Sequence, residues 1–541
     1  MKILIECAHR NFEVYFKLCQ VLYDKYPSAS FAYFSRDIKT KSLFEESENP
    51  KFKIYDRPDF NKFDRLILDS NNFDYESDLN LIKNFEEYSE MTIWKMIAAD
   101  RSIGWNDHIG NYGTYIPKDF RSTPKHLIPI MAKEIRGIAD VFNDFKPDIF
   151  IPAMCMGSVS VFILEQMCKK SGVKYLLPDF SRVSNLHRFT EDIMCLSPEI
   201  DNDYYKILEE DVNDCQKGKK LFDEISDELS NLNNFDTEYL QSYGFHEVKN
   251  LFDSCNLFKQ FFFEISVDLV NFIKSLIKSI RNPDLNFSII YHKLKLSLVI
   301  HSQRYSNKKT VLDKSFGQLP QDGQKYLYFP LYNIPEYSSN FQSTMWLDIV
   351  SLVETLSKSI PGDWIIVLKE HPTGLEHNCR HKNFYDRINR IPNAMFAPLL
   401  ANSRELIENA EIVFITVGTS GWEAILKGTP VLATVDNFWD CMGLSAKSSN
   451  IETLFLDIKK TVSDHKKISS AEREKRIITF LEALLNNSFP ISNPEVFSYY
   501  YQGTKEQYSK QGIELANGLI DYIEKLKIDK NISNKKYFGS K

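Results

Sequence analysis

The sequence predicts an α/β protein built on parallel sheets. Short apolar segments alternate with longer segments in which apolar residues recur at helical spacing, an order typical of strand–helix–strand units. Ile365–Leu368 is apolar at every position, as in strands buried on both faces of a parallel sheet. The chain has 541 residues, and domains usually contain about 100–200, so we expect two or three domains.

The composition excludes several other classes of protein. Hydrophobic residues make up 43% of the chain, so disorder does not dominate. The net charge of −7 disfavours a nucleic-acid-binding protein, which usually carries a basic field. The cysteine count, 9, is odd and includes no Cys-x-x-Cys pair, which favours a reducing, cytoplasmic location over a disulfide framework or a zinc site. Without an uncharged apolar stretch of about 18 residues, a membrane-spanning helix is not expected.

Residues 1–192 form the first predicted α/β unit. Apolar residues at helical spacing predict the helix Asn11–Lys25, and Pro147 and Gly157 delimit the strand Asp148–Pro152. The predicted elements in order are strand Lys2–Glu6, helix Asn11–Lys25, strands Ser30–Phe34 and Arg65–Leu68, helix Tyr88–Ala99, strand Asp148–Pro152, helix Gly157–Ser171 and strand Val173–Leu177.

Residues 193–310 differ from the rest of the chain in composition, and their pattern predicts a helical insertion. Its first part is rich in acidic residues, its second part is basic, and glycine is nearly absent. The helix Asn256–Arg281 carries a wide apolar stripe flanked by basic residues. Such a helix is able to dock on an anionic membrane surface. The alternative, which we expect, is that the stripe packs against the rest of the insertion.

Residues 311–490 form the second predicted α/β unit, and residues 491–541 a C-terminal helix and a basic tail that frays. Glycine and proline mark a linker at Val311–Gly323. The predicted elements are strand Lys325–Leu331, helix Ser343–Ser359, strands Trp364–Lys369 and Glu411–Val417, helix Gly421–Lys427, strand Pro430–Val435 and helices Ala471–Asn486 and Thr504–Lys527.

The clearest motif is a loop rich in glycine and hydroxyl residues between a buried strand and a short helix. It contains Gly418, Thr419, Ser420 and Gly421. Backbone N–H groups at a helix start favour an anion, and small residues let a phosphate approach. Glu423, in the first helical turn, is a candidate partner for ribose hydroxyls. The alternative is a capped helix without a ligand; a P-loop is excluded because the Gly-Lys-Ser/Thr signature is missing.

Two further loops follow strands of the same unit. Lys369 and His371 end the strand Trp364–Lys369, just before Pro372, and Glu336 follows Phe329-Pro330-Leu331 in a loop with two prolines. Ligands of open α/β sheets gather at the carboxyl ends of the strands. His371 is therefore placed to meet a phosphate or a leaving group, although a strand cap and an exposed turn would explain the two loops equally simply.

Together these motifs resemble the bacterial glycosyltransferases of GT-B type that build capsules and other surface polysaccharides, related in motif to sialyl-, Kdo- and glycerophosphate-type transferases. The shared pieces lie in Phe329–Glu336, Lys369–Pro372 and Thr416–Val431. The resemblance covers about Lys325–Leu456, is faint before Thr190 and does not extend to the insertion. It implies two Rossmann-like domains with a cleft between them.

The resemblance also implies roles for residues. The histidine of the His-Pro motif, here His371, contacts the donor phosphate, which the hydroxyls of Thr419 and Ser420 also bind. Glu423 pairs with the ribose, and Lys369 adds positive charge. Electrostatic stabilisation of the leaving nucleotide then replaces a metal ion, so we expect no metal and no cofactor other than the nucleotide-sugar substrate.

The N-terminal unit is then expected to bind a glycan or lipid-linked acceptor and to supply a general base. Glu6 and His9 follow the first strand and are the first candidates, because either can accept a proton from a hydroxyl. Asp100-Arg101 and Asp179 are rivals, and each of them is as readily a structural group.

We therefore predict a metal-independent glycosyltransferase that uses a nucleotide-activated donor, with a CMP-linked acidic sugar as one candidate. Two alternatives remain. A nucleotide-sugar epimerase would need carboxylates beside the sugar, for which Glu336 is the best-placed candidate. A non-catalytic component of polysaccharide assembly or export would have no reason to keep His371, Ser420 and Glu423. The protein is expected in the cytoplasm, with peripheral contact to the inner face of the cell membrane as a further possibility.

Overall fold

The structure, a computed structural model, describes residues 1–7, 12–35, 38–56, 74–100, 123–153, 158–210, 215–231, 254–281, 287–313, 315–334, 336–371, 380–493, 503–525 and 537–539. The predicted strand Arg65–Leu68 and the candidate residues His9 and Arg101 lie outside these ranges.

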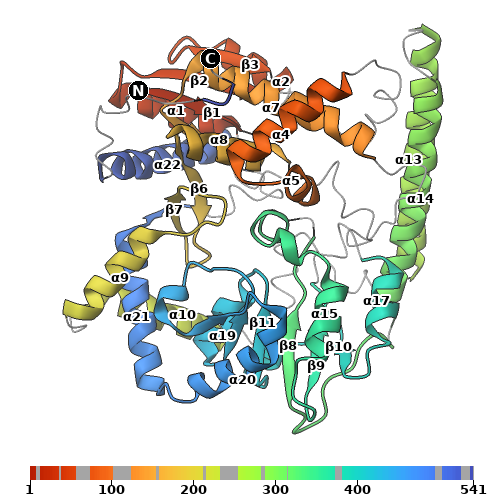
Figure 1. The fold of residues 1–541 in the computed structure, drawn as a ribbon, viewed down its shortest axis with the longest axis vertical. Helices are drawn as coiled ribbons and strands as arrows, with labels where there is room; N and C mark the ends of the chain where they lie inside the picture. The colour runs from red at the N-terminus through yellow and green to blue at the C-terminus, as the bar shows by residue number, and fades with distance from the viewer. Residues whose placement is uncertain are drawn as a thin grey trace.

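The first sheet, which with its helices we call the N-lobe, is entirely parallel in the order β3-β2-β1-β4-β5 (Figure 1). Ile3 and Ile5 of β1 pack against α1, whereas Leu4 points to the opposite face and joins the cluster around α7 and α8. Both faces of the sheet are thus covered by helices. The elements are β1 (Lys2–Ile5), α1 (Phe12–Lys25), β2 (Ser30–Ser35), α2 (Ile38–Glu45), β3 (Phe52–Asp56), α4 (Tyr75–Ser89), α5 (Ile93–Ala99), α7 (Pro124–Phe145), β4 (Ile149–Ile151), α8 (Ser160–Ser171) and β5 (Lys174–Tyr175).

The second sheet, in what we call the C-lobe, has the order β10-β9-β8-β11-β12-β13 and is also parallel. Written by sequence, this is the 3-2-1-4-5-6 order of a Rossmann domain. The elements are β8 (Tyr326–Pro330), α15 (Ile349–Ser357), β9 (Ile365–Lys369), α17 (Lys382–Ile388), β10 (Ala394–Phe396), α18 (Ser403–Glu408), β11 (Ile412–Ile415), α19 (Ser420–Lys427), β12 (Val431–Ala433), β13 (Ser445–Lys447), α20 (Leu454–His465) and α21 (Ser470–Asn486). Short helical turns add Ser338–Gln342, Thr344–Trp346, Asp440–Met442 and Ile451–Thr453.

A small antiparallel sheet, which the sequence did not predict, lies between the lobes. It consists of β6 (Leu177–Phe180), β7 (Leu186–Thr190) and β14 (Phe489–Pro490), in the order β14-β7-β6. The predicted strand Val173–Leu177 is wrong as one element, because β5 belongs to the N-lobe sheet and β6 starts the small sheet. β7 was missed because His187 and Arg188 break its apolar pattern.

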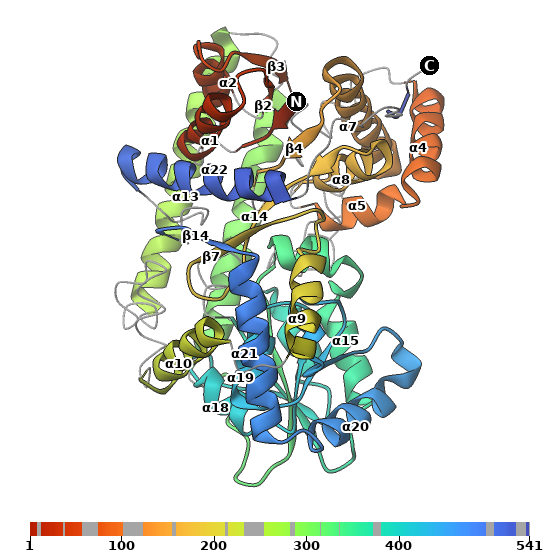
Figure 2. The ribbon, with the colours of Figure 1, turned by 90° about the vertical axis from the view of Figure 1, so that its left-hand side faces the viewer.

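The end of the chain returns to the N-lobe. After α21 the chain passes through β14, and α22 (Lys505–Lys525) packs along α1 (Figure 2). Tyr537 is buried and Phe538 packs beside it in the N-lobe core. The expectation of a frayed basic tail is therefore wrong at these positions, because the rings of Tyr537 and Phe538 pack against Phe142 and Phe85.

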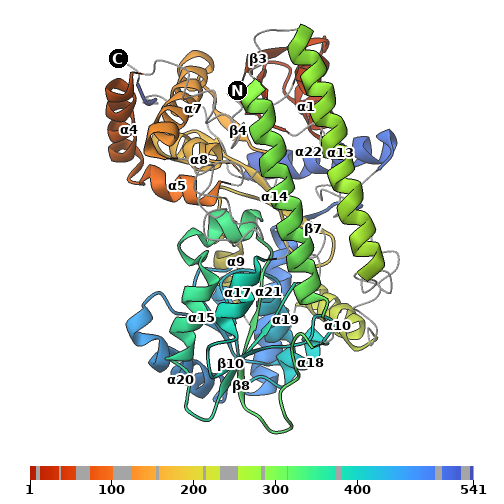
Figure 3. The same ribbon diagram turned by 90° about the vertical axis from the view of Figure 1, so that its right-hand side faces the viewer.

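Residues 198–311 are helical where they are described. Two helices, α9 (Pro198–Glu210) and α10 (Gln216–Asn231), pack on α21 of the C-lobe. Two long helices, α13 (Ser254–Arg281) and α14 (Phe287–Val311), form a pair that lies along one side of both lobes (Figure 3). Part of the apolar stripe of α13 packs within the insertion as expected, since the ring of Phe261 lies against Tyr305 of α14. Other residues of the stripe are exposed: Phe258, Phe262, Leu269 and Ile273.

The α/β fold class with two Rossmann-like sheets and a helical insertion is confirmed. The predicted strands that became β1, β2, β4, β8, β9, β11 and β12 are confirmed within two residues at each end. The predicted helix Ser343–Ser359 is shorter than expected, because α15 begins only at Ile349. Of the described helices, none combines the length and the apolar content needed to cross a membrane.

The contact between α22 and α1 yields a stability prediction. A Cβ atom added at Gly512 would lie 2.6 Å from the carbonyl oxygen of Val14 and 2.7 Å from the Cβ atom of Lys17. Gly512→Ala should therefore push α22 off α1 and lower the free energy of unfolding by about 1–3 kcal/mol, measured by urea denaturation. Gly362→Ala is the matched control, since a Cβ atom there would meet nothing within 4 Å. Equal effects of the two substitutions would contradict this packing.

Candidate functional site

The topology of the C-lobe brings four loops to one edge of the sheet. β8 lies between β9 and β11, and the chain builds the sheet outward from β8 in both directions. The connections therefore diverge at the carboxyl ends of β8 and β11, where doubly wound sheets bind ligands. The loops that follow β8, β9, β11 and β12 all leave the sheet at this edge, and three of them carry the residues that the sequence singled out.

The loop after β11 is shaped by two glycines. The backbone of Gly418 has φ +122°, a conformation that residues other than glycine rarely adopt. A Cβ atom at Gly421 would lie 2.5 Å from Ile415 and 3.0 Å from Trp439, so glycine allows α19 to start close to the strand. Gly418 and Thr419 are exposed and Ser420 is partly exposed. The loop thus presents backbone and hydroxyl groups to solvent at the start of α19.

Two buried polar groups lie close to this loop. Thr434 follows β12, and its hydroxyl oxygen is buried without a hydrogen-bond partner among the described residues. The same is true of Trp439 Nε1, and the Trp439 ring contacts the position of Gly421. Unsatisfied buried polar groups are costly in a folded protein, so they often mark places where a ligand or water completes the hydrogen bonding.

Lys369 supplies a buried positive charge at the end of β9. Its exposed fraction is 4%, and its charge acts on both His371 and Glu423. Burial, together with the charges of Lys369 and Arg380, lowers the pKa of His371 to about 4. Burial raises the pKa of Glu423, whereas Arg404 and Lys369 oppose that rise. The structure therefore brings Lys369, His371 and Glu423 into one electrostatic cluster, in which the histidine is neutral at pH 7.

A buried ion pair that the sequence analysis missed anchors this strand end. Glu370 accepts two hydrogen bonds from Arg380 Nε, at 3.1 and 3.3 Å, and one from the Tyr385 hydroxyl at 2.9 Å. It also accepts the backbone N–H of His371 at 3.0 Å. Arg380 in turn donates to the carbonyl oxygen of Tyr332 at 2.6 Å, in the loop after β8. Glu370 and Arg380 thus hold the loop after β9 to the loop after β8. In the sequence, the acidic residue directly before His371 is the feature that could have indicated this pair.

Glu336 belongs to a different environment. Its carboxylate is exposed and accepts a hydrogen bond from Asn333 Nδ2 at 3.1 Å, within its own loop. The residues that follow reach the N-lobe: Asn340 Nδ2 donates to the carbonyl oxygen of Ala99 at 2.8 Å, and Phe341 packs on Phe162. Among the described contacts none joins Glu336 to His371, and the segment directly after Glu336 contacts the N-lobe.

Two of the acid/base candidates of the N-lobe, Glu6 and Asp100, are buried. Glu6 follows β1 as predicted, but it is only 1% exposed. Asp100 is buried and accepts the backbone N–H of Val159 at 2.8 Å, immediately before α8. Asp100 therefore acts as a cap for α8, which is a structural role. Glu6 would need a rearrangement to meet an acceptor hydroxyl.

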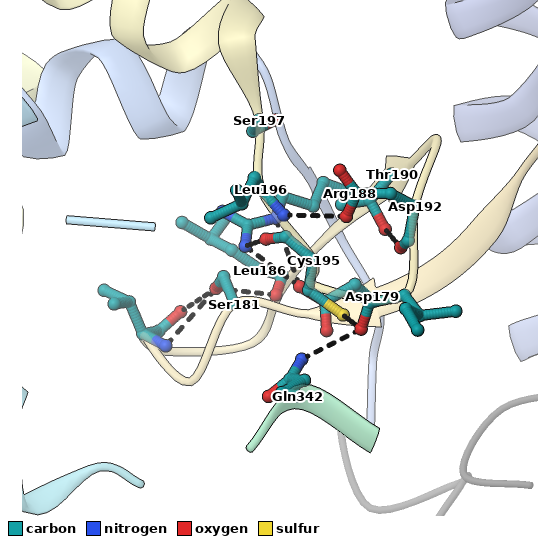
Figure 4. Close-up of polar contacts among 12 residues, drawn as sticks. Asp179, Ser181, Leu186, Arg188, Thr190, Asp192, Cys195, Leu196, Ser197 and Gln342 are labelled. Carbon is teal, nitrogen blue, oxygen red and sulfur yellow. Dashed lines mark hydrogen bonds and ion pairs between the residues drawn. The ribbon is translucent and has the colours of Figure 1, made fainter. Parts of the chain in front are cut away.

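Asp179, the last rival, forms an ion pair with Arg188 on the neighbouring strand of the small sheet. Arg188 Nε donates to Asp179 Oδ2 at 3.1 Å, and Arg188 Nη2 donates to the carbonyl oxygen of Cys195 at 2.8 Å (Figure 4). On the C-lobe side, the guanidinium lies 4.7 Å from the centre of the Phe438 ring. Figure 4 also shows Gln342 reaching this loop, where it donates to the carbonyl oxygen of Ile193 at 3.2 Å. Asp179 is thus engaged by Arg188, and Arg188 contacts the C-lobe.

Within the described ranges, no group of three His, Cys, Asp or Glu side chains is arranged to hold a metal ion. The Asp-x-Asp sequence Asp201-Asn202-Asp203, a pattern that could bind a metal ion, lies in the first turns of α9, and Asp203 accepts hydrogen bonds from Asn486 and Asn487. It is therefore engaged with α21.

Comparisons with known proteins find no matching family model and no matching curated protein. Among solved structures, UDP-GlcNAc 2-epimerase from Neisseria meningitidis is 12% identical with a TM-score of 0.21, covering 90% of this chain and 100% of that one. KpsC of Thermosulfurimonas dismutans, a β-Kdo 2,7 transferase, is 12% identical with a TM-score of 0.30, covering 72% and 89%. Anabaena HepE, in complex with UDP and glucose, is 10% identical with a TM-score of 0.22, covering 97% and 100%. At these values the comparisons do not bear on activity.

The lowered pKa of His371 predicts a pH dependence of stability. The unfolded chain binds a proton near pH 6.5, whereas folded His371 does so only near pH 4, so acid favours the unfolded state between these values. The stability contributed by neutral His371 is complete above pH 6.5 and is lost as the pH falls toward 4. In His371→Gln the loss of unfolding free energy over this range should be smaller by about 1–3 kcal/mol. Urea denaturation at several pH values measures it, and identical pH profiles would contradict the prediction.

The Glu370–Arg380 pair predicts a large effect of a single substitution. Arg380→Leu leaves the Glu370 carboxylate buried without its cation and should lower the free energy of unfolding by about 3–5 kcal/mol. Adding Glu370→Gln should recover part of this loss. Arg387→Leu is the control, because Arg387 pairs with Glu354 on the surface and such pairs contribute about 0–1 kcal/mol. A similar loss in both single variants, measured by urea denaturation, would refute the anchoring role.

Proposed function

We propose that this chain is a glycosyltransferase that moves a sugar from a nucleotide-activated donor onto a surface glycan or a lipid-linked acceptor. The observation that carries the proposal is the position of Lys369 and His371 at the end of β9, and of Thr419 and Ser420 at the start of α19. Both positions lie at the carboxyl edge of a Rossmann-type sheet. This is where such sheets bind nucleotides.

The donor phosphate would lie between the end of β9 and the start of α19. Lys369 supplies the positive charge, and because that charge is buried it acts through a medium of low polarity. Thr419, Ser420 and the backbone N–H groups at the start of α19 donate hydrogen bonds to the phosphate oxygens. The φ of Gly418 turns the chain so that the loop can approach the phosphate closely.

His371 would act as a neutral hydrogen-bond donor. Its lowered pKa, about 4, keeps the ring uncharged at pH 7, so the cation of the site is Lys369 and not the imidazole. Glu370 accepts the backbone N–H of His371 and thereby fixes the position of the residue. Glu423 lies on the first turn of α19, close enough to Lys369 for the lysine charge to act on the pKa of its carboxyl group. We assign Glu423 as the partner of the ribose hydroxyls.

In the reaction, the bond between the anomeric carbon and the phosphate oxygen breaks, and the nucleotide leaves with the bonding electron pair. The acceptor hydroxyl oxygen forms the new bond to the anomeric carbon, and its proton passes to a general base. Negative charge develops on the leaving phosphate, where Lys369 and the loop donors stabilise it more strongly than in the ground state. We assign no general base among the described residues, because Glu6 and Asp100 are buried and Asp179 is paired with Arg188.

Binding of nucleotides tests the phosphate site. Thermal unfolding with CMP, UDP or CDP should show a rise in Tm for at least one of them, because a ligand that binds only the folded state stabilises it. Lys369→Met should weaken binding of that nucleotide by at least about tenfold, as measured by calorimetry. Lys427→Met, on the far end of α19, should bind like the wild type. If no nucleotide raises the Tm, the assignment of this edge as a donor site fails.

Product analysis separates transfer from the epimerase alternative. A transferase incubated with the bound nucleotide sugar and acceptor releases the free nucleotide, whereas a 2-epimerase inverts the sugar at C2 without a change in mass. Mass spectrometry and proton NMR distinguish these products. We expect His371→Ala to abolish nucleotide release while the Tm of the unliganded protein falls little. Normal turnover in this variant would overturn the role of His371.

A further inference from the structure

The side of α13 that packs on α14 carries both of its carboxylates as well as Phe261, whose ring lies beside Tyr305. Glu264 and Asp268 face α14, where Glu264 Oε2 lies 2.8 Å from His301 Nδ1 and Asp268 Oδ2 lies 2.8 Å from His301 Nε2. Ser297 of α14 donates to the same carboxylate of Asp268. These polar contacts hold the two helices together and direct the carboxylates of α13 toward α14, where Glu264 and Asp268 are 30% and 24% exposed.

The opposite side of α13 is apolar and exposed. Phe263 is 68% exposed and Ile273 is 54% exposed, values unusual for large apolar residues in such number. The exposed residues recur at helical spacing and share one face: Phe258, Phe262, Phe263, Val267, Leu269, Val270, Ile273 and Ile277. We call them the α13 face. Contiguous exposed apolar surface of this kind marks a site of interaction with a protein or a membrane.

The charges on this side of α13 have one sign. Between residues 257 and 277, the exposed charged side chains are those of Lys259 and Lys274. Lys295 and Lys309 of α14 are also exposed. A surface that combines apolar residues with lysines and has its carboxylates directed toward α14 complements a negatively charged, partly apolar partner.

We propose that the α13 face docks in the plane of an anionic membrane. An in-plane helix inserts its apolar side chains at the level of the headgroups, while lysines extend their charged ends to the lipid phosphates. A second copy of this chain fits less well, because a two-fold contact between α13 faces would bring Lys259 and Lys274 of both copies together without carboxylates. The proposal does not depend on the proposed catalytic activity.

Docking in this way would fix the orientation of the whole molecule. The α13–α14 pair lies along one side of the protein beside both lobes (Figure 3), so the protein would lie lengthwise on the membrane surface. A glycan or lipid acceptor carried by the membrane would then be held within reach of the enzyme in two dimensions.

Co-sedimentation of the full-length protein with vesicles tests the proposal. The wild type should bind vesicles of phosphatidylcholine and phosphatidylglycerol, and bind pure phosphatidylcholine vesicles much more weakly. Phe263→Asp with Ile273→Asp should reduce binding to the anionic vesicles at least tenfold. Leu456→Asp is the matched control, since Leu456 is 63% exposed on α20, away from the α13 face, and this variant should bind like the wild type.

A second pair of variants tests the role of charge. Lys259→Gln with Lys274→Gln should remove the preference for anionic vesicles, whereas Lys220→Gln on α10, also strongly exposed, should keep it. All variants should retain the wild-type Tm, because none of the changed side chains is buried. Absence of vesicle binding by the wild type would overturn the proposal. So would a dimer, seen by light scattering, that Phe263→Asp with Ile273→Asp dissociates while vesicle binding is unchanged.

Discussion

The position of the candidate site depends on one constraint of the fold. In both large sheets the first strand lies in the interior, between the second and the fourth, so the chain builds each sheet outward in two directions. Right-handed crossovers then place helices on opposite faces of the sheet. The loops that lead to these helices therefore diverge at the carboxyl ends of the first and the fourth strand, where the order of the strands reverses. Every residue proposed to bind the donor lies at that edge of the C-lobe, although the loops that carry these residues are far apart in the sequence.

The arrangement of charges at this edge follows from the alternation of side chains. Neighbouring residues of a strand point to opposite sides, so Lys369 and Glu370 separate although they are adjacent. Glu370 is neutralised by Arg380, and Lys369 remains able to act on His371 and Glu423. An anchor and a positively charged binding group are thus built from two consecutive residues. The anchor lies in the C-lobe alone, and a comparable pair, Asp179 and Arg188, holds the small sheet between the lobes.

The sequence pattern was sufficient to predict strands that are apolar throughout and helices with one apolar face. The strands β1, β8, β9 and β11 are almost wholly apolar, and the helices α1, α19 and α21 keep a clear helical period. The pattern failed where tertiary contacts decide the structure. β7 is a strand although it contains His187 and Arg188, because Asp179 and Phe438 come from elsewhere to partner the arginine. For the same reason Arg380 went unnoticed, since its partner Glu370 is separated from it by ten positions whose sequence gives no sign of a pair. The burial of Glu6 likewise depends on β4 and β5, which no local pattern reveals.

The return of the chain to its first lobe has a consequence for biosynthesis. The N-lobe core requires α22 and Tyr537, so it is not complete when the N-lobe sheet has been translated. At about 5–20 residues per second, α1 waits roughly 25–100 s before α22 leaves the ribosome. The C-lobe has no such dependence and can close its core first. The nascent N-lobe therefore lacks the partner of α1 during most of translation.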